Sequence, residues 1–135
     1  MVGKAIRATN APRTKRGAPA DEDPSDRSHM KKIWRGVKEL NEGFGRKGNH
    51  LIPIKVISAS NQIVAGRLYR FEVLVGESES PRDSVNAAKL KKSNCKLKEG
   101  GSRSLYKIKL YERLWLKYEK FTINKIRDVD ANESI

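Results

Sequence analysis

The chain has 135 residues, enough for one compact domain and too few for two of ordinary size. Its hydrophobic fraction of 37% and charged fraction of 33% place it on the polar side of average. No apolar run is long enough to cross a bilayer, so we expect no membrane partner. The net charge of +13 would attract polyanions or acidic protein surfaces, although a solvated basic face is the simpler interpretation.

The single cysteine, Cys95, cannot form an internal disulfide, so the core must hold the fold together. This cysteine usage suits a reducing compartment without excluding an exported protein. Cys95 lies in a lysine-rich loop, and the two histidines, His29 and His50, show no spacing typical of a catalytic triad or a metal site. We therefore expect no enzymatic activity, no metal and no cofactor.

The first part of the chain predicts a mobile arm followed by one helix. Residues 1–27 are rich in proline and charge and contain no aromatic residue, so they cannot bury enough surface to offset the entropy of ordering. Apolar residues at three- and four-residue steps then predict a helix; they are Met30, Ile33, Trp34, Val37, Leu40 and Phe44. The glycine-rich residues 43–48 end it.

The rest of the chain predicts about four strands. Residues 51–57 are β-branched and apolar, and Pro53 indicates an irregular start or a position near a sheet edge. Side chains alternate in polarity in three further segments, residues 67–75, 106–111 and 121–123. Residues 76–103 predict a long surface loop with a short helical turn at 85–90, and residues 128–135 a frayed tail.

A helix with one apolar stripe and a sheet with one apolar face can bury each other. The predicted fold class is therefore α+β, with a curled antiparallel sheet of four to five strands wrapped around one long helix. The domain would span residues 28–127, between the arm and the tail.

The segment Gln62-Ile63-Val64-Ala65-Gly66 lies between two strand patterns that are close enough to form a hairpin. Hairpin tips normally contain Asn, Gly, Asp or Pro, and an apolar tip costs solubility unless a partner covers it. An alternative places the turn at Ser60-Asn61, which would leave Ile63 and Val64 in the core.

Gln62, Val64 and Gly66 form a Gln-x-Val-x-Gly pattern that resembles the signature of the cystatin family of cysteine-protease inhibitors. As in that family, the pattern stands between the first two sheet strands after a single long helix. Residues 34–41 resemble the cystatin helix that ends in an Asn, and residues 69–72 resemble its second strand.

Two further elements stand in the family's order. Leu114-Trp115 takes the place of the Pro-Trp of the second cystatin hairpin, and Gly17-Ala18 that of the glycine in the segment before the helix. The resemblance spans residues 17–126 and is to the longer, secreted, type 2-like cystatins of invertebrates such as nematodes.

The chain also departs from the family pattern. Secreted animal cystatins usually have two disulfides, and with Cys95 alone neither can form, which predicts an unusually mobile loop at residues 76–103. Some members block legumain through an Asn in a Ser-Asn-Asp-like segment, but residues 43–47 contain no such motif, so we expect no legumain site.

The resemblance implies a reversible, tight-binding inhibitor of papain-like cysteine proteases of the cathepsin L, B or S type. Family members insert a wedge into the protease cleft, made of the N-terminal arm and two hairpin loops. Carried over, the protease-binding residues are Gly17, Ala18, Gln62, Ile63, Val64, Ala65, Gly66, Leu114 and Trp115. An alternative for Trp115 is that it covers the sheet edge.

The alternative function is a basic nucleic-acid or polyanion-binding module on a cystatin-like fold that has lost inhibition. Aromatic residues interleaved with lysines suggest a stacking surface; they are Tyr106, Tyr111, Trp115 and Tyr118, with Lys107, Lys109 and Lys117. The resemblance implies secretion, whereas a native start at Met1 without a signal peptide would imply the cytoplasm. A monomer is expected, with a domain-swapped dimer as the alternative.

Overall fold

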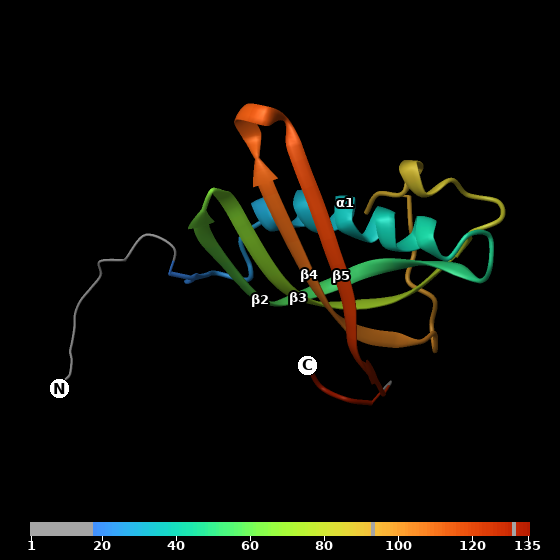
Figure 1. Cartoon of the computed structure of the whole chain (residues 1–135). Coiled ribbons are helices and arrows are strands. Elements are labelled where there is room, and N and C mark those ends of the chain that lie inside the picture. Colours follow the sequence, from blue (N-terminus) through green and yellow to red (C-terminus); the bar gives the residue numbers. More distant parts are fainter. Residues whose placement is uncertain (1–17, 93, 131) are drawn as a thin grey trace.

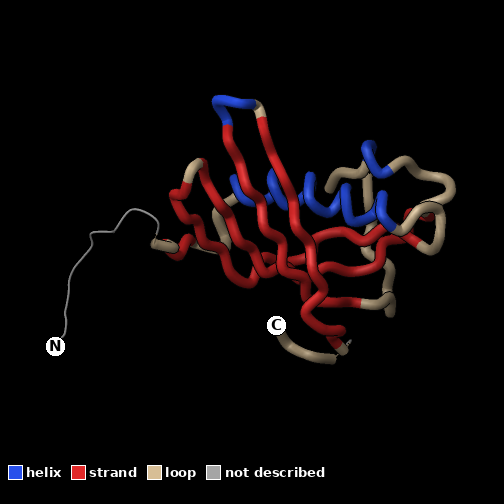
Figure 2. Tube along the Cα trace, in the orientation of Figure 1, coloured by secondary structure: helices blue, strands red, loops and turns tan. Residues whose placement is uncertain are grey.

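The computed structural model describes residues 18–92, 94–130 and 132–135. One α-helix and five strands appear among them, and these strands form an antiparallel sheet in the order β1-β2-β3-β4-β5 (Figures 1 and 2). The elements are β1 (Ala20–Glu22), α1 (Ser28–Gly43), β2 (Asn49–Val64), β3 (Gly66–Pro81), η1 (Ala87–Lys89), β4 (Arg103–Arg113), η2 (Leu114–Leu116) and β5 (Tyr118–Val129). The predicted α+β fold class is confirmed.

Helix α1 lies across the face of the curled sheet and closes the core (Figure 1). Ile33 and Val37 are completely buried, as the helical spacing predicted, and Gly36 lies between them. A Cβ on Gly36 would lie 3.1 Å from the ring of Phe121 and 3.2 Å from Ile108, so the glycine lets the helix approach the sheet closely. The buried residues of this core are Ile33, Val37, Val56, Ala59, Phe71, Val73, Val75, Tyr106 and Ile108.

Just before the helix, the short strand β1 pairs with β2, with Ala20 opposite Asn61 and Glu22 opposite Ala59. By composition these residues belong to the predicted mobile arm. The strand was not predicted because its stability comes from backbone pairing with the edge of β2, a contact that composition cannot show. Asn61 also donates a side-chain hydrogen bond to Glu22, which secures the segment. Residues 1–17 lie outside the described part.

The helix start carries its own local stabilisation. The backbone N–H of Ser28 donates to the carboxylate of Asp26 at 2.9 Å. Hydrogen bonds from Ser28 hold the pKa of the Asp26 carboxyl below its ordinary value. An acidic group at this end of a helix also complements the helix dipole.

Several strands extend further than the sequence pattern predicted. β3 runs to Pro81, into the predicted loop, and β5 runs to Val129, into the predicted tail. Turn η1 confirms the predicted helical turn. The register of β2 against β3 shifts between Pro53 and Lys55, as expected where proline supplies no N–H to the ladder.

The loop after β3 is held by backbone contacts in place of a disulfide. Glu79 donates its N–H to the carbonyl of Lys96 at 2.8 Å, and Lys98 donates to the carbonyl of Glu77 at 2.9 Å. The side chain of Leu97 lies against Gly76, where a Cβ would come within 2.8 Å of it. These contacts dock residues 96–98 onto β3.

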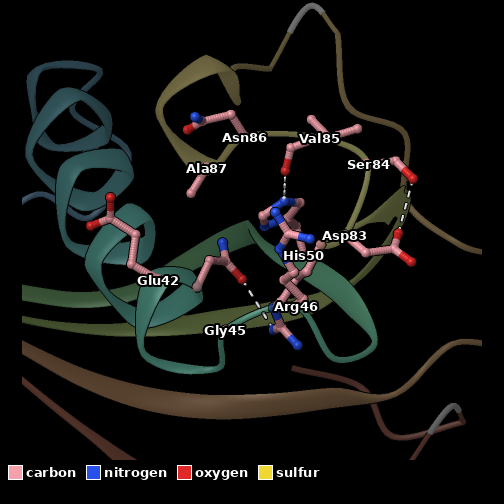
Figure 3. A pocket seen from close by; sticks show the side chains of 11 residues that line it. Glu42, Gly45, Arg46, His50, Asp83, Ser84, Val85, Asn86 and Ala87 are labelled. Atoms are coloured by element: carbon pink, nitrogen blue, oxygen red, sulfur yellow. Dashed lines mark hydrogen bonds between the residues drawn. The ribbon is translucent and has the colours of Figure 1, made fainter.

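At the C-terminal end of α1, Asn41 joins the helix to the sheet. Its side chain accepts from the N–H of Leu51 at 2.7 Å and donates to the carbonyl of Leu51 at 2.8 Å. Arg82 donates to the same side-chain oxygen of Asn41. Beside it, a ring nitrogen of His50 forms a hydrogen bond with the carbonyl of Val85, and these residues line a hollow of about 350 Å³ (Figure 3). Asn41, His50 and Arg82, which line this hollow, are therefore already used to anchor the segment that follows β3.

The close approach at Gly36 yields a stability test. Gly36→Val would push methyl groups into Phe121 and Ile108, and we expect the free energy of unfolding to fall by about 1–3 kcal/mol, as for other overpacked cores. Urea unfolding followed by circular dichroism measures the change. Gly43→Val is the matched control, because a Cβ at Gly43 in the same helix meets nothing within 4 Å. Equal effects of the two substitutions would contradict the close approach.

Candidate functional site

The first hairpin has its tip at Val64-Ala65-Gly66, since Val64 pairs with Gly66 and Ala65 forms the turn. Ile63 and Val64 keep 46% and 38% of their surfaces exposed. The alternative turn at Ser60-Asn61 is wrong, because those residues pair with β3 inside the ladder. An apolar hairpin tip therefore faces solvent.

Gly66 meets two constraints that exclude other residues. Its φ of +128° lies in a region that residues with a side chain rarely adopt. A Cβ would also lie 2.3 Å from the carbonyl oxygen of Glu112 on β4. The glycine thus permits both the tight turn and the close contact between the β2–β3 hairpin and β4.

The carbonyl of Ala65 ties the first hairpin to the second. The hydroxyl of Tyr111 donates to it, and so does Nε of Arg113 at 2.9 Å. Both donors stand at the end of β4, immediately before the second hairpin turns. The two hairpin tips are therefore fixed relative to each other by hydrogen bonds as well as by the sheet.

The second hairpin presents the most exposed apolar side chains of the described residues. Its turn is the short helix η2, and Lys117 closes it with a φ of +51°. Leu114, Trp115 and Leu116 are 73%, 67% and 59% exposed. Trp115 therefore does not cover the sheet edge, and the guanidinium of Arg113 lies 5.7 Å from its ring.

Tyr118 adds a further exposed ring at the start of β5. It is 45% exposed and packs edge-on against Tyr111, with ring centroids 6.0 Å apart. Neither Tyr118 nor Leu116 is among the protease-binding residues predicted from the sequence. The signal was available in the three consecutive apolar residues 114–116 between charged neighbours, which is unusual for a turn.

The described part of the arm runs beside the first hairpin. Ala20 pairs with Asn61, three residues before the tip residue Val64, so Ala18 and Pro19 leave the sheet on the side of this hairpin (Figure 1). Gln62 points back along the sheet, where its Oε1 accepts from Arg70 at 2.9 Å. Gly17 lies outside the described residues. The structure thus brings together Ala18, the first tip and the second tip at one end of the sheet.

One ring of the aromatic surface considered for nucleic acid is not available for stacking. Tyr106 is only 6% exposed and belongs to the core, where burial raises the pKa of its hydroxyl. Lys107 follows it on the opposite face of the sheet. Tyr106 and the neighbouring lysine therefore cannot share one binding face.

The groups considered for catalysis or metal binding are scattered. His29 packs against the ring of Phe71, His50 bonds Val85 at the far end of the sheet, and Cys95 lies in the loop after η1. Within the described residues, no three His, Cys, Asp or Glu side chains gather as a metal site would require. No described helix is long and apolar enough to cross a membrane.

Comparison with known proteins decides the family. Residues 17–126 match the cystatin domain family. The chain belongs to the cystatin family. It is 43% identical over 103 residues to cystatin cpi-1 of Caenorhabditis elegans, covering 76% of this chain and 73% of that one. It is 28% identical over 113 residues to onchocystatin of Onchocerca volvulus, covering 84% and 68%.

Solved cystatin structures share the fold. The crystal structure of Al-CPI aligns with a TM-score of 0.70 at 20% identity, covering 84% of this chain and all 100% of that one. Dimeric human cystatin F aligns with a TM-score of 0.69 at 16% identity, covering 90% and 94%. Membership in a family of cysteine-protease inhibitors means that this cystatin acts by binding a protease and is not an enzyme.

The geometry of Gly66 can be tested by stability alone. Gly66→Ala combines an unfavourable φ with a 2.3 Å contact, and we expect it to lower the unfolding free energy by about 2–4 kcal/mol. Gly45→Ala is the control, because Gly45 has a φ of +69° but open space around its Cβ position. Thermal unfolding of both variants measures the difference. A Gly66→Ala loss no larger than that of Gly45→Ala would contradict the steric contact with Glu112.

Proposed function

We propose that this cystatin is a reversible, tight-binding inhibitor of papain-like cysteine proteases, of the cathepsin L, B or S type, and that its hairpin end fills their active-site cleft. One observation carries the proposal. Two apolar hairpin tips stand side by side at one end of the sheet and are joined through the carbonyl of Ala65. Their exposed apolar side chains are Ile63, Val64, Leu114, Trp115, Leu116 and Tyr118.

The fixed spacing of the two tips supports tight binding. Association costs the entropy of every segment that becomes ordered, and a surface that is already rigid avoids much of that cost. Here the ladder of β2 with β3, the ladder of β4 with β5 and the donors Tyr111 and Arg113 hold the tips before any partner arrives. An interface of standard size, about 1,600 Å², then suffices for tight binding when its anchors are well packed.

Trp115 is the proposed anchor of the second tip. Trp is enriched among the residues that dominate binding energy. Trp115 is 67% exposed, and the Arg113 guanidinium lies over its ring. Leu114, in the place of the family's proline, would cover apolar surface beside it. The closed turn at Lys117 supplies rigidity that the missing proline would otherwise have given.

The N-terminal arm is the third proposed contact. The pairing of β1 with β2 places Ala18 beside the first hairpin, so we expect the residues before Ala18 to continue toward the same end of the molecule. In the proposed complex Gly17 and Ala18 follow the protease cleft on one side of the catalytic thiolate. A turn of the chain at Gly17 would keep its peptide bonds away from the thiolate, which accounts for binding without cleavage.

A monomer is the proposed inhibitory form. Exchange of α1 and β2 between two chains would have to open the turn at residues 62–66, because that turn joins β2 to β3. The first tip of the wedge would then be lost. Size-exclusion chromatography of the material used for inhibition assays distinguishes the two forms.

The proposal is tested by titrating papain and a cathepsin L-like protease with the protein and following hydrolysis of a fluorogenic peptide. We expect Trp115→Ala to raise the inhibition constant by roughly 30-fold, the size of a hot-spot loss of about 2 kcal/mol. Ile63→Ala should weaken inhibition less. Ile126→Ala is its matched control, since Ile126 is also 46% exposed but lies on β5 away from the tips.

Two outcomes would reject this function. One is an absence of inhibition by folded, monomeric protein. The other is inhibition that Trp115→Ala and Ile63→Ala leave unchanged, which would place the protease contact elsewhere.

The contribution of the arm is tested by deleting residues 1–18, a change that leaves β1 in place. We expect faster dissociation from papain, because an apolar and main-chain contact is lost while the hairpin tips remain. Stopped-flow association and jump-dilution experiments separate the two rate constants. The unfolding midpoint should not change, and an unchanged dissociation rate would remove the arm from the wedge.

A further inference from the structure

The outer face of the sheet, away from α1, carries a group of basic side chains on adjacent strands. Side chains alternate between the two faces of a strand, and the neighbours of the core residues Phe71 and Ile108 therefore point outward. On this face Arg70 of β3 stands directly opposite Lys109 of β4. We call Arg70, Lys107, Lys109 and Lys120 together the basic face.

These four groups lie close together. Directly opposite residues of antiparallel strands have Cβ atoms about 5 Å apart, which applies to Arg70 and Lys109. Lys107 and Lys109 are two residues apart on β4, a spacing of roughly 6.8 Å along a strand. Lys120 of β5 pairs with Tyr111, which is the next residue after Lys109 on the outer face of β4. The spacing brings four positive charges within reach of a single extended polyanion.

No member of the basic face forms an ion pair among the described residues, although basic residues elsewhere do. Arg35 pairs with Glu119 at 2.8 Å, and Lys125 and Arg127 pair with acidic groups of the C-terminal segment. Arg70 bonds only the neutral amide of Gln62. Two acidic residues lie on the same side of the sheet. Glu72 stands directly opposite Lys107 and accepts from the hydroxyl of Ser58, and Asp21 lines the same hollow as Arg70.

Like charges directly opposite each other destabilise a sheet. Neither the core nor the hairpin tips require Lys109 to be basic, because its side chain points away from α1 and it stands before the second tip on β4. A bound polyanion would remove the repulsion and release its own counterions, so both effects favour binding.

We propose that the basic face binds a sulfated polysaccharide, with the sulfate groups contacting Lys107, Lys109 and Lys120. Nucleic acid is the less suitable polyanion, because single strands are held mainly by stacking of bases on aromatic rings. Two rings lie on this face, those of Tyr111 and Tyr118, and they pack edge-on against each other at its hairpin end, where the Tyr111 hydroxyl donates to Ala65. Lysine ammonium groups on adjacent strands suit the regularly spaced, rotatable sulfates of a linear glycan.

Most of the proposed glycan site lies away from the protease-binding tips, and Lys120, two residues from Tyr118, stands nearest to them. Lys107 and Lys109 lie on the broad outer surface of β4, whereas the proposed wedge uses the turns at 64–66 and 114–117. The glycan would thus hold the inhibitor in place while the tips stay free. The proposal does not rest on the inhibitory function and can be tested without a protease.

The experiment measures the affinity of the full chain for heparin by isothermal titration calorimetry at several salt concentrations. The test variant is Lys107→Gln/Lys109→Gln. Its control is Lys31→Gln/Lys38→Gln, which removes the same charge from two exposed positions on α1. We expect the β4 variant to bind about tenfold more weakly and to lose roughly two from the slope of log K against log salt, and the α1 variant to change little.

Further arms separate the alternatives. Dextran sulfate should bind and unmodified dextran should not, and a single-stranded DNA of equal charge should bind more weakly than heparin. Equal losses in the two double variants would show attraction by net charge alone and overturn the assigned face. Tighter binding of DNA would overturn the choice of glycan. The unfolding midpoint of the β4 variant should stay close to that of the unchanged protein, because Lys109 faces Arg70, Lys107 faces Glu72, and both lysines point away from the core.

Discussion

The packing of α1 into the curled sheet is the constraint on which the other features of this protein depend. With Cys95 as its single cysteine the chain has no internal disulfide, so burial of the helix stripe supplies the main stabilisation. Gly36 brings the helix near enough for Ile33 and Val37 to reach the core. Because the strands are held on one side by this packing, they can project both hairpins beyond the core (Figure 1).

The apolar tips are stable because polar atoms beneath them are satisfied. Tyr111 and Arg113 direct their donors at the carbonyl of Ala65, and this leaves the turn rigid while its side chains face water. A monomeric protein gains nothing from exposing Trp115, which indicates that a partner is to cover it. Cystatin membership implies a cysteine-protease partner, and in the proposed complex that partner covers Trp115.

The molecule separates its apolar and its charged surfaces. The hairpin end presents aliphatic and aromatic side chains, whereas the outer face of β3, β4 and β5 presents unpaired lysines. Acidic residues are used near the C-terminus and beside α1, where Asp128, Glu133 and Glu119 pair with local bases. The outer face of the sheet thus holds a part of the excess positive charge that is separate from the hairpin turns, and this is where the proposed polyanion would bind.

The sequence by itself determined the helix stripe, the alternating strands, the α+β class and the apolar Gln62–Gly66 segment, because periodicity and composition are local properties. It could not show β1, the full lengths of β3 and β5, or the choice between turns at Ser60-Asn61 and at the apolar tip. Those features depend on pairing between distant segments. Likewise, only the tertiary structure joined Ala65 to Tyr111 and Arg113 and separated Tyr106 from Lys107, because the sheet decides which side chains share a face.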